Sequence, residues 1–191
     1  MENSKTGLKR AEWFIVTTFG SHENRVAQNI INRIESFNLT DYVFDAISAE
    51  ETVLVEGKDG KPKEKKENLY KGFVFVHMIM TDESWYMVRN TPGVTGICGS
   101  SGRGTKPTPV PKSEMNAILK RLGRISEEMI NEYEINDTVK IINGPFYGLE
   151  GVIKSINRDT KMFQVEVTHF FGQASTADVS FADVEKVKTK K

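Results

Sequence analysis

Cysteines, long apolar runs and a leading apolar segment are scarce or missing in this sequence, and each absence excludes a class of protein. The 191 residues include one cysteine, Cys98, so no disulfide can form within the chain. No apolar run approaches the ~20 residues that a membrane helix needs, and residues 1–10 have no apolar core of the signal-peptide kind. We therefore expect a cytoplasmic protein with no membrane segment.

Groups that could converge on a catalytic or metal site are also few. The three histidines, His22, His77 and His169, have no partner at metal-ligand spacing. The glycine-rich run from Gly99 to Gly104 lacks the Gly-Lys-Ser/Thr ending of a phosphate-binding loop. Cys98 lies in an apolar stretch, where it is interpreted as a small core residue rather than a nucleophile. We therefore predict no enzymatic activity, no metal site and no cofactor.

An excess of positive charge is missing as well. Lysine plus arginine and aspartate plus glutamate number 26 each, whereas a protein that binds mainly duplex phosphate is usually strongly basic. This balance favours protein partners, with any nucleic-acid contact local and secondary. The lysine-rich run 57–66 is interpreted as the solvated tip of a hairpin, and whether it touches nucleic acid stays open.

Up to residue 122 the chain alternates between strand and helix patterns. Bulky and β-branched residues over 12–19 predict a buried strand, and Ser21 is the predicted N-cap of the next helix. The apolar run 71–80 predicts a central strand covered on both faces for part of its length. Further strands are expected at 43–47, 52–55 and 94–98, and helices over 23–37, from Asp82 and from 111–113. The pattern predicts an α+β first domain over 10–122, an antiparallel sheet flanked by helices.

After residue 122 the helical patterns end, and a polar segment is followed by short β-rich runs. A polar segment over 123–132 is interpreted as a linker, although Met129 and Ile130 could prolong the preceding helix. Short β-rich runs separated by turns then follow, at 138–142, 151–156, 163–167 and 177–181. Regular short strands of this kind predict a second domain over 133–187 with the fold of a small SH3-like β-barrel.

Two sets of motifs carry a resemblance to a known family. The run Asp137–Ile153 contains an Asn-Gly-Pro turn, two further glycines and exposed-looking aromatics, and it resembles the KOW motif. The blocks Trp13–Val16, Tyr70–Val76 and Ser84–Val94 resemble the NGN domain of the NusG family. Together these blocks cover roughly residues 10–187.

The resemblance implies a monomeric transcription elongation factor that binds RNA polymerase and modulates elongation, pausing, termination and antitermination. Family members contact the clamp helices of the polymerase through aromatic residues at the positions of Trp13, Tyr70 and Phe73. Exposed rings suit such a surface because they bury a large area at modest entropic cost. For Trp13 a core position is an equally good interpretation. Lys71 stands where many relatives have proline, so the loop there is expected to be less rigid.

The resemblance also implies a local contact with the non-template DNA strand. Asn90 and Thr91 match a pair that some relatives use on this strand to promote pausing. Amide and hydroxyl groups can read base edges. The alternative interpretation of Asn90 is a helix C-cap before the Pro-Gly turn.

In the second domain, the family's partner surface matches Phe146, Phe170, Phe171 and Gln173. Adjacent phenylalanines cannot both point inward from a pleated strand, so at least one is expected to be exposed. The implied partner is a small-subunit ribosomal protein, and in many bacteria termination factor Rho competes for the same site. Relatives often have arginine where this chain has Gln173, which predicts a weakened or altered contact with Rho.

Two other hypotheses compete with this interpretation. A KOW-containing ribosome-binding or RNA-binding protein would explain the second domain, but not the NGN blocks. A specialised paralogue whose second domain refolds as helices is disfavoured by the many β-branched residues over 138–181.

Overall fold

The computed structural model describes residues 10–56, 61–100, 106–168 and 174–187, and the chain divides into two compact units, Met1–Met115 and Asn116–Lys191. The first unit contains β1 (Glu12–Thr18), α1 (Glu23–Ser36), β2 (Val43–Ile47), β3 (Glu50–Glu56), β4 (Pro62–Asn68), β5 (Phe73–Met78), α2 (Asp82–Arg89) and β6 (Val94–Ile97). Helix α3 (Lys112–Arg121) spans the division. The second unit continues with α4 (Glu127–Ile130), β7 (Thr138–Ile141), β8 (Glu150–Asn157), β9 (Met162–Thr168), β10 (Ala174–Ser180), a 3-10 turn (Phe181–Asp183) and β11 (Val184–Lys186).

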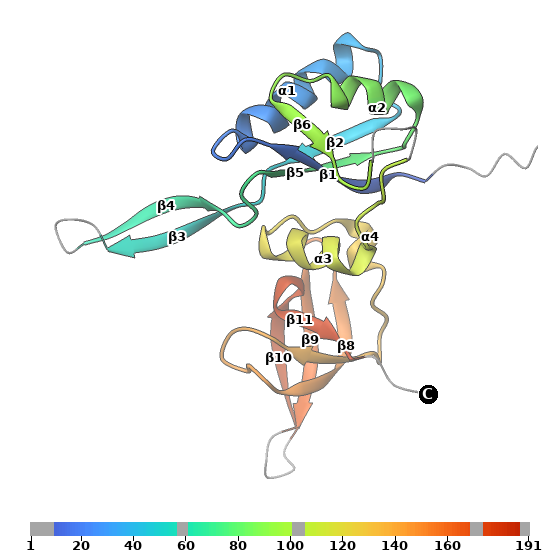
Figure 1. The fold of residues 1–191 in the computed structure, drawn as a ribbon. Coiled ribbons are helices and arrows are strands. Elements are labelled where there is room, and N and C mark those ends of the chain that lie inside the picture. Colours follow the sequence, from blue (N-terminus) through green and yellow to red (C-terminus); the bar gives the residue numbers. More distant parts are fainter. Residues whose placement is uncertain (1–9, 57–60, 101–105, 169–173, 188–191) are drawn as a thin grey trace, which may run out of the picture. The chain divides into compact units, whose positions relative to one another are not determined.

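The first unit is built on a four-stranded antiparallel sheet in the order β2-β5-β1-β6. Both α1 and α2 lie on the same face of this sheet (Figure 1). Because side chains alternate along a strand, every second residue of β1 and β5 points towards the helices. The buried hydrophobic residues of β1 and β5 on that face are Phe14, Val16, Val74, Val76 and Met78. The predicted antiparallel sheet flanked by helices is confirmed.

Strand β5 lies between β1 and β2, as its apolar sequence predicts. Val74, Phe75 and Val76 are buried in succession, so both faces of the strand are covered over this stretch. A run of three consecutive buried residues is typical of a strand inside the sheet, where neighbours flank it on both sides and side chains cover both surfaces.

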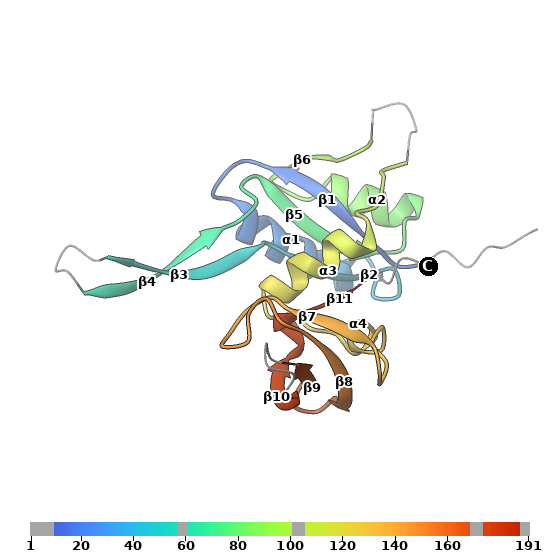
Figure 2. The same cartoon turned by 90° about the horizontal axis from the view of Figure 1, so that it is seen from below.

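A two-stranded ribbon formed by β3 and β4 projects from the body of the first unit (Figures 1 and 2). The predicted hairpin tip was 57–66, but strand β4 already begins at Pro62 and pairs Lys63 with Val55. A run made mostly of lysine and glutamate shows no apolar period, so the sequence pattern predicted no strand there. Residues 57–60 lie outside the described residues.

The start of α1 differs from the sequence prediction. His22, not Ser21, occupies the N-cap position, and its side chain makes no capping hydrogen bond. Ser21 adopts a left-handed conformation with φ +69°, so it belongs to the tight turn after β1 rather than to the helix. The buried carboxylate of Glu23, in the first turn of α1, lies where the helix N-terminus favours negative charge.

The second unit contains a five-stranded antiparallel sheet in the order β10-β9-β8-β7-β11. The register shifts between Ile153 and Ser155 of β8, and such irregularities bend a sheet. The rings of Tyr133, Phe163 and Phe181 pack together with centroids 5.2–5.4 Å apart. The predicted α+β fold followed by a small all-β domain is confirmed, although β10 and β11 do not pair to close the barrel among the described residues.

The segment that joins the two sheets in the sequence contains two helices, α3 and α4, although its composition is polar. The Nζ atom of Lys120, on α3, donates to Tyr133 Oη at 3.0 Å and to the carbonyl of Val184 at 2.9 Å. Burial lowers the pKa of Lys120 and raises the pKa of Tyr133 to about 12. Met129 and Ile130 of α4 are buried within the predicted linker 123–132. Whether this segment acts as a linker stays a prediction.

Candidate functional site

The face of the first sheet opposite α1 and α2 carries a group of aromatic side chains. The rings of Trp13 and His77, on paired positions of β1 and β5, stack with centroids 4.9 Å apart and an interplanar angle of 15°. The Phe44 ring lies 5.5 Å from that of His77 and is 47% exposed. Together with Tyr70 and Phe73, these residues are called the aromatic face below.

A tight turn from Tyr70 to Phe73 presents the other two rings of the aromatic face. The Phe73 N–H donates to the Tyr70 carbonyl at 3.1 Å, and Gly72 has φ +81°. These are the features of a type II turn, in which the third position needs glycine. Tyr70 is 40% exposed and Phe73 is 37% exposed. The Tyr70 ring also packs edge-on against buried Phe75, with centroids 5.6 Å apart.

The structure thus brings Trp13, Tyr70 and Phe73 to one face of the sheet, and it leaves Tyr70 and Phe73 open to solvent. Trp13 is half-buried and stacked, so it supports the face as well as forming part of it. Phe44 was missed by the sequence reasoning. The signal was present, because strand alternation places Phe44 opposite the buried Val43 and so away from the core.

The end of α2 separates the two residues that the sequence reasoning treated as a pair. Asn90 is exposed at the C-cap, and its Nδ2 donates to the Tyr86 carbonyl at 2.8 Å. Thr91 is only 2% exposed, and its hydroxyl donates to the Met87 carbonyl at 2.8 Å. In this conformation Asn90 is available to an outside ligand, whereas the Thr91 hydroxyl is used inside the fold.

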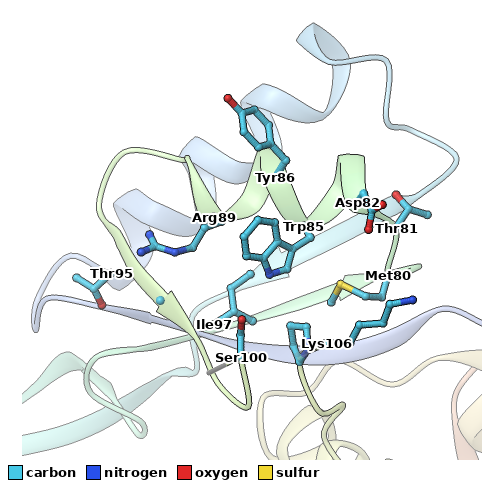
Figure 3. A pocket seen from close by; sticks show the side chains of 12 residues that line it. Met80, Thr81, Asp82, Trp85, Tyr86, Arg89, Thr95, Ile97, Ser100 and Lys106 are labelled. Atoms are coloured by element: carbon cyan, nitrogen blue, oxygen red, sulfur yellow. The ribbon is translucent and has the colours of Figure 1, made fainter. Parts of the chain in front are cut away.

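A pocket of about 700 Å³ lies between α2, β6 and the segment around Pro107, and it is lined by Arg89, which precedes Asn90 in the chain. Figure 3 shows the Trp85 indole between the Arg89 and Lys106 side chains. Met80 and Ile97 add apolar lining, and the Asp82 carboxylate also faces the pocket. Aromatic surface beside cationic side chains is the combination that binds single-stranded nucleic acid. The sequence did not reveal this pocket, because its parts come from separate elements.

The turn between β7 and β8 exposes aromatic surface in the second unit. The Tyr147 N–H donates to the Gly144 carbonyl at 3.2 Å, and the Gly148 N–H donates to the Ile141 carbonyl at 2.8 Å. Phe146 is half-buried by this turn, whereas Tyr147 is 73% exposed. Tyr147 therefore adds to the surface predicted for Phe146. The predicted residues Phe170, Phe171 and Gln173 lie outside the described residues.

The remaining candidates for chemistry do not converge. The described part of the chain contains no group of three or more His, Cys, Asp or Glu side chains that could hold a metal ion. Cys98, predicted to be a core residue, is half-buried, and burial raises the pKa of its thiol. A raised pKa keeps the thiol protonated and weakly nucleophilic. Among the described helices, none has the length and apolarity needed to cross a membrane.

Comparison with known proteins identifies the family. The family profile "Transcription termination factor nusG" matches residues 11–119, and the "KOW motif" profile matches residues 135–168. The transcription termination/antitermination protein NusG of Halalkalibacterium halodurans is 39% identical over 177 residues, covering 92% of this chain and 98% of that protein. NusG of Staphylococcus aureus is 40% identical over 185 residues, covering 97% of this chain and 100% of that protein.

A solved structure agrees with the sequence relatives. The structure described as "Domain interaction in Thermotoga maritima NusG" is 31% identical and has a TM-score of 0.50. The match covers 94% of this chain and 98% of that one. Both units of the chain are therefore represented in its relatives. The chain belongs to the NusG family of transcription termination/antitermination factors.

Proposed function

We propose that this protein is an elongation factor that binds RNA polymerase through the aromatic face, which docks on the clamp helices. The observation that carries the proposal is the exposure of Tyr70, Phe73 and Phe44 on the sheet face that lacks α1 and α2. Exposed rings gathered on one face mark an interaction site. A pair of helices offers a ridged apolar surface that such rings can grip.

Co-purification tests this proposal directly. The tagged full chain should retain RNA polymerase, and a coiled-coil fragment carrying the clamp helices should compete for it. Retention of ribosomes without polymerase would instead favour the alternative of a KOW-containing ribosome-binding protein. Retention of neither would sink both.

The contact with the non-template DNA strand is proposed for Asn90 and for the pocket that the preceding residue, Arg89, lines. Asn90 presents an exposed amide at the end of α2, and Arg89 precedes it in the chain and lines the pocket. The cations Arg89 and Lys106 can hold phosphate while the Asn90 amide meets a base edge. Thr91 supports this surface from inside through its hydrogen bond to the Met87 carbonyl.

Replacing Asn90 by alanine should shorten polymerase pauses about fivefold or more, since a good base contact is worth roughly 1–3 kcal/mol. The measurement is pause half-life in a single-round transcription assay with saturating protein. Asn32→Ala, which removes an exposed asparagine from α1, is the matched control and should leave the pause unchanged. Equal pause lifetimes for Asn90→Ala and wild type would remove Asn90 from the contact.

For the second unit, we propose a small-subunit ribosomal protein as the partner, docking on the surface around Phe146 and Tyr147. An exposed tyrosine next to a half-buried phenylalanine is the kind of anchor that carries binding energy at interfaces. Rho is proposed as a competitor for the same surface, so a bound ribosomal protein should exclude it.

The variants Phe146→Ala and Tyr147→Ala should each weaken the ribosomal protein about tenfold, because an interface anchor typically contributes more than 1 kcal/mol. Calorimetric titration of the full chain with the purified ribosomal protein measures this change. Ile135→Ala removes another exposed apolar side chain of the same unit and serves as the control. A loss no greater than that of the control would place the partner elsewhere.

A further inference from the structure

A buried carboxylate lies directly behind the turn that carries Tyr70 and Phe73. Glu23 is 4% exposed and is the one charged residue in the buried class within the described part of the chain. Its Oε1 atom accepts a hydrogen bond from the Gly72 N–H at 2.6 Å. Buried charges are retained where they have specific partners, and here a partner is the backbone of the turn.

The turn is held through both polar groups of the Gly72 backbone. The Gly72 N–H donates to Glu23, and the Gly72 carbonyl accepts from the Thr18 N–H at 2.9 Å. A Cβ atom added to Gly72 would lie 3.3 Å from the Thr18 carbonyl oxygen, so the turn packs closely against the end of β1. A second hold comes from Asn68, whose Oδ1 accepts the Tyr70 N–H at 2.9 Å.

The chemistry around Glu23 favours its ionised form. Burial raises the pKa of the Glu23 carboxyl. Hydrogen bonds from the backbone N–H groups of Gly72, Glu23 itself and Ser21, together with the charge of His22, lower this pKa by more than burial raises it. The net pKa lies below the ordinary value for glutamate. A carboxylate with several N–H donors is a rigid acceptor, since its charge-assisted hydrogen bonds are stronger than neutral ones.

We infer that Glu23 is a positioning residue of the polymerase interface, which orients Tyr70 and Phe73 by fixing the Gly72 peptide. The inference rests on the proposed role of the aromatic face. The identity of residue 71, a lysine, explains why the Tyr70–Phe73 turn needs a restraint from Glu23. Proline is favoured at the second position of a type II turn because its ring fixes φ there, and lysine does not supply that restriction. The Glu23 carboxylate supplies the restraint from outside the turn.

The test is a set of variants of the full chain, with affinity for purified RNA polymerase as the readout. Glu23→Ala and Glu23→Asp should each weaken binding about tenfold, because neither side chain reaches Gly72. Glu23→Asp keeps the negative charge at the start of α1 but shortens the side chain. It therefore separates the loss of the hydrogen bond to Gly72 from any loss of the favourable interaction with the helix dipole. Glu23→Gln retains one acceptor oxygen and should lose about threefold. Binding of the second unit's partner should not change.

The decisive readout is coupling. In a Tyr70→Ala plus Phe73→Ala background, adding Glu23→Asp should weaken polymerase binding by less than a further factor of about two, because the rings that Glu23 orients are gone. Lys71→Pro should restore most of the affinity lost in Glu23→Asp. Equal tenfold losses in both backgrounds would overturn the inference and reduce Glu23 to a structural residue. If the two alanines themselves leave polymerase binding intact, the proposed function fails and the inference falls with it.

Discussion

Replacing Tyr70 and Phe73 together by alanine should weaken the binding of RNA polymerase about 100-fold or more. Each ring is more than a third exposed on the face of the sheet opposite α1 and α2, so each is available to bury in a partner. Interface hot spots contribute about 2 kcal/mol or more each, and 1.4 kcal/mol corresponds to a tenfold change in Kd. The measurement is the dissociation constant of the full chain for core RNA polymerase, by biolayer interferometry.

Phe37→Ala is the matched control for this pair. Phe37 is 43% exposed at the C-cap of α1, on the helix side of the sheet, where its ring lies 4.7 Å from the Arg33 guanidinium carbon. The variant removes comparable aromatic surface from the other side of the unit and should bind polymerase as wild type does. Thermal unfolding of all the variants should stay close to wild type, since the rings are surface residues. Tight binding by the double variant would relocate the polymerase contact to another surface.

The second large effect concerns the stability of the second unit. Gly151→Ala should lower its melting temperature by roughly 15 °C, given several degrees per kcal/mol for a unit of this size. A Cβ atom at Gly151 would lie 2.5 Å from Val165 Cγ1 and 2.6 Å from the Glu166 carbonyl oxygen. Strand β9 cannot retreat without breaking its register with β8, so the clash should cost about 3 kcal/mol. That is a large share of a small unit's total stability.

Gly148→Ala separates steric overlap from backbone strain. Gly148 has φ +85°, but a Cβ atom added there would meet no atom within 4 Å beyond its chain neighbours, so only the conformational cost of about 1 kcal/mol applies. Calorimetry and circular dichroism follow the two transitions of the chain. The first unit should melt as in wild type, and the Gly151→Ala chain should still bind polymerase while losing the ribosomal protein. A Gly151→Ala unit as stable as Gly148→Ala would mean that β9 adjusts to the extra methyl group.

Much of the fold follows from local patterns in the sequence. The apolar stripe through Val26, Ile30 and Ile34 predicted α1, and all three residues are buried against the first sheet. The uninterrupted apolar run around Val74 predicted a central strand, and β5 is one. These predictions succeed because apolar residues at helical or strand spacing lie on one face of the element, and the hydrophobic effect buries that face.

Other features depend on the conformation of the short turns between elements. Asn90 and Thr91 are adjacent, yet Asn90 is exposed and Thr91 is buried, because Thr91 lies four positions after buried Met87 and its hydroxyl donates to the Met87 carbonyl. The capping role expected for Ser21 is absent because the turn after β1 takes Ser21 into a left-handed conformation. The left-handed turn at Ser21 has no signature in composition or spacing.

By itself, the sequence determined most of the strands and helices, although not β4 or α4. It also determined the separation into an α+β part and an all-β part, and the motifs that reveal the family. Tertiary structure alone decided that Phe44 joins Tyr70 and Phe73 on one surface, and that the Glu23 carboxylate reaches a turn 49 positions later. The physical reason is the range of the forces involved. The spacing of apolar residues within one element shows which face of that element is buried. Contacts between different elements arise only when β1, β5 and α1 pack together.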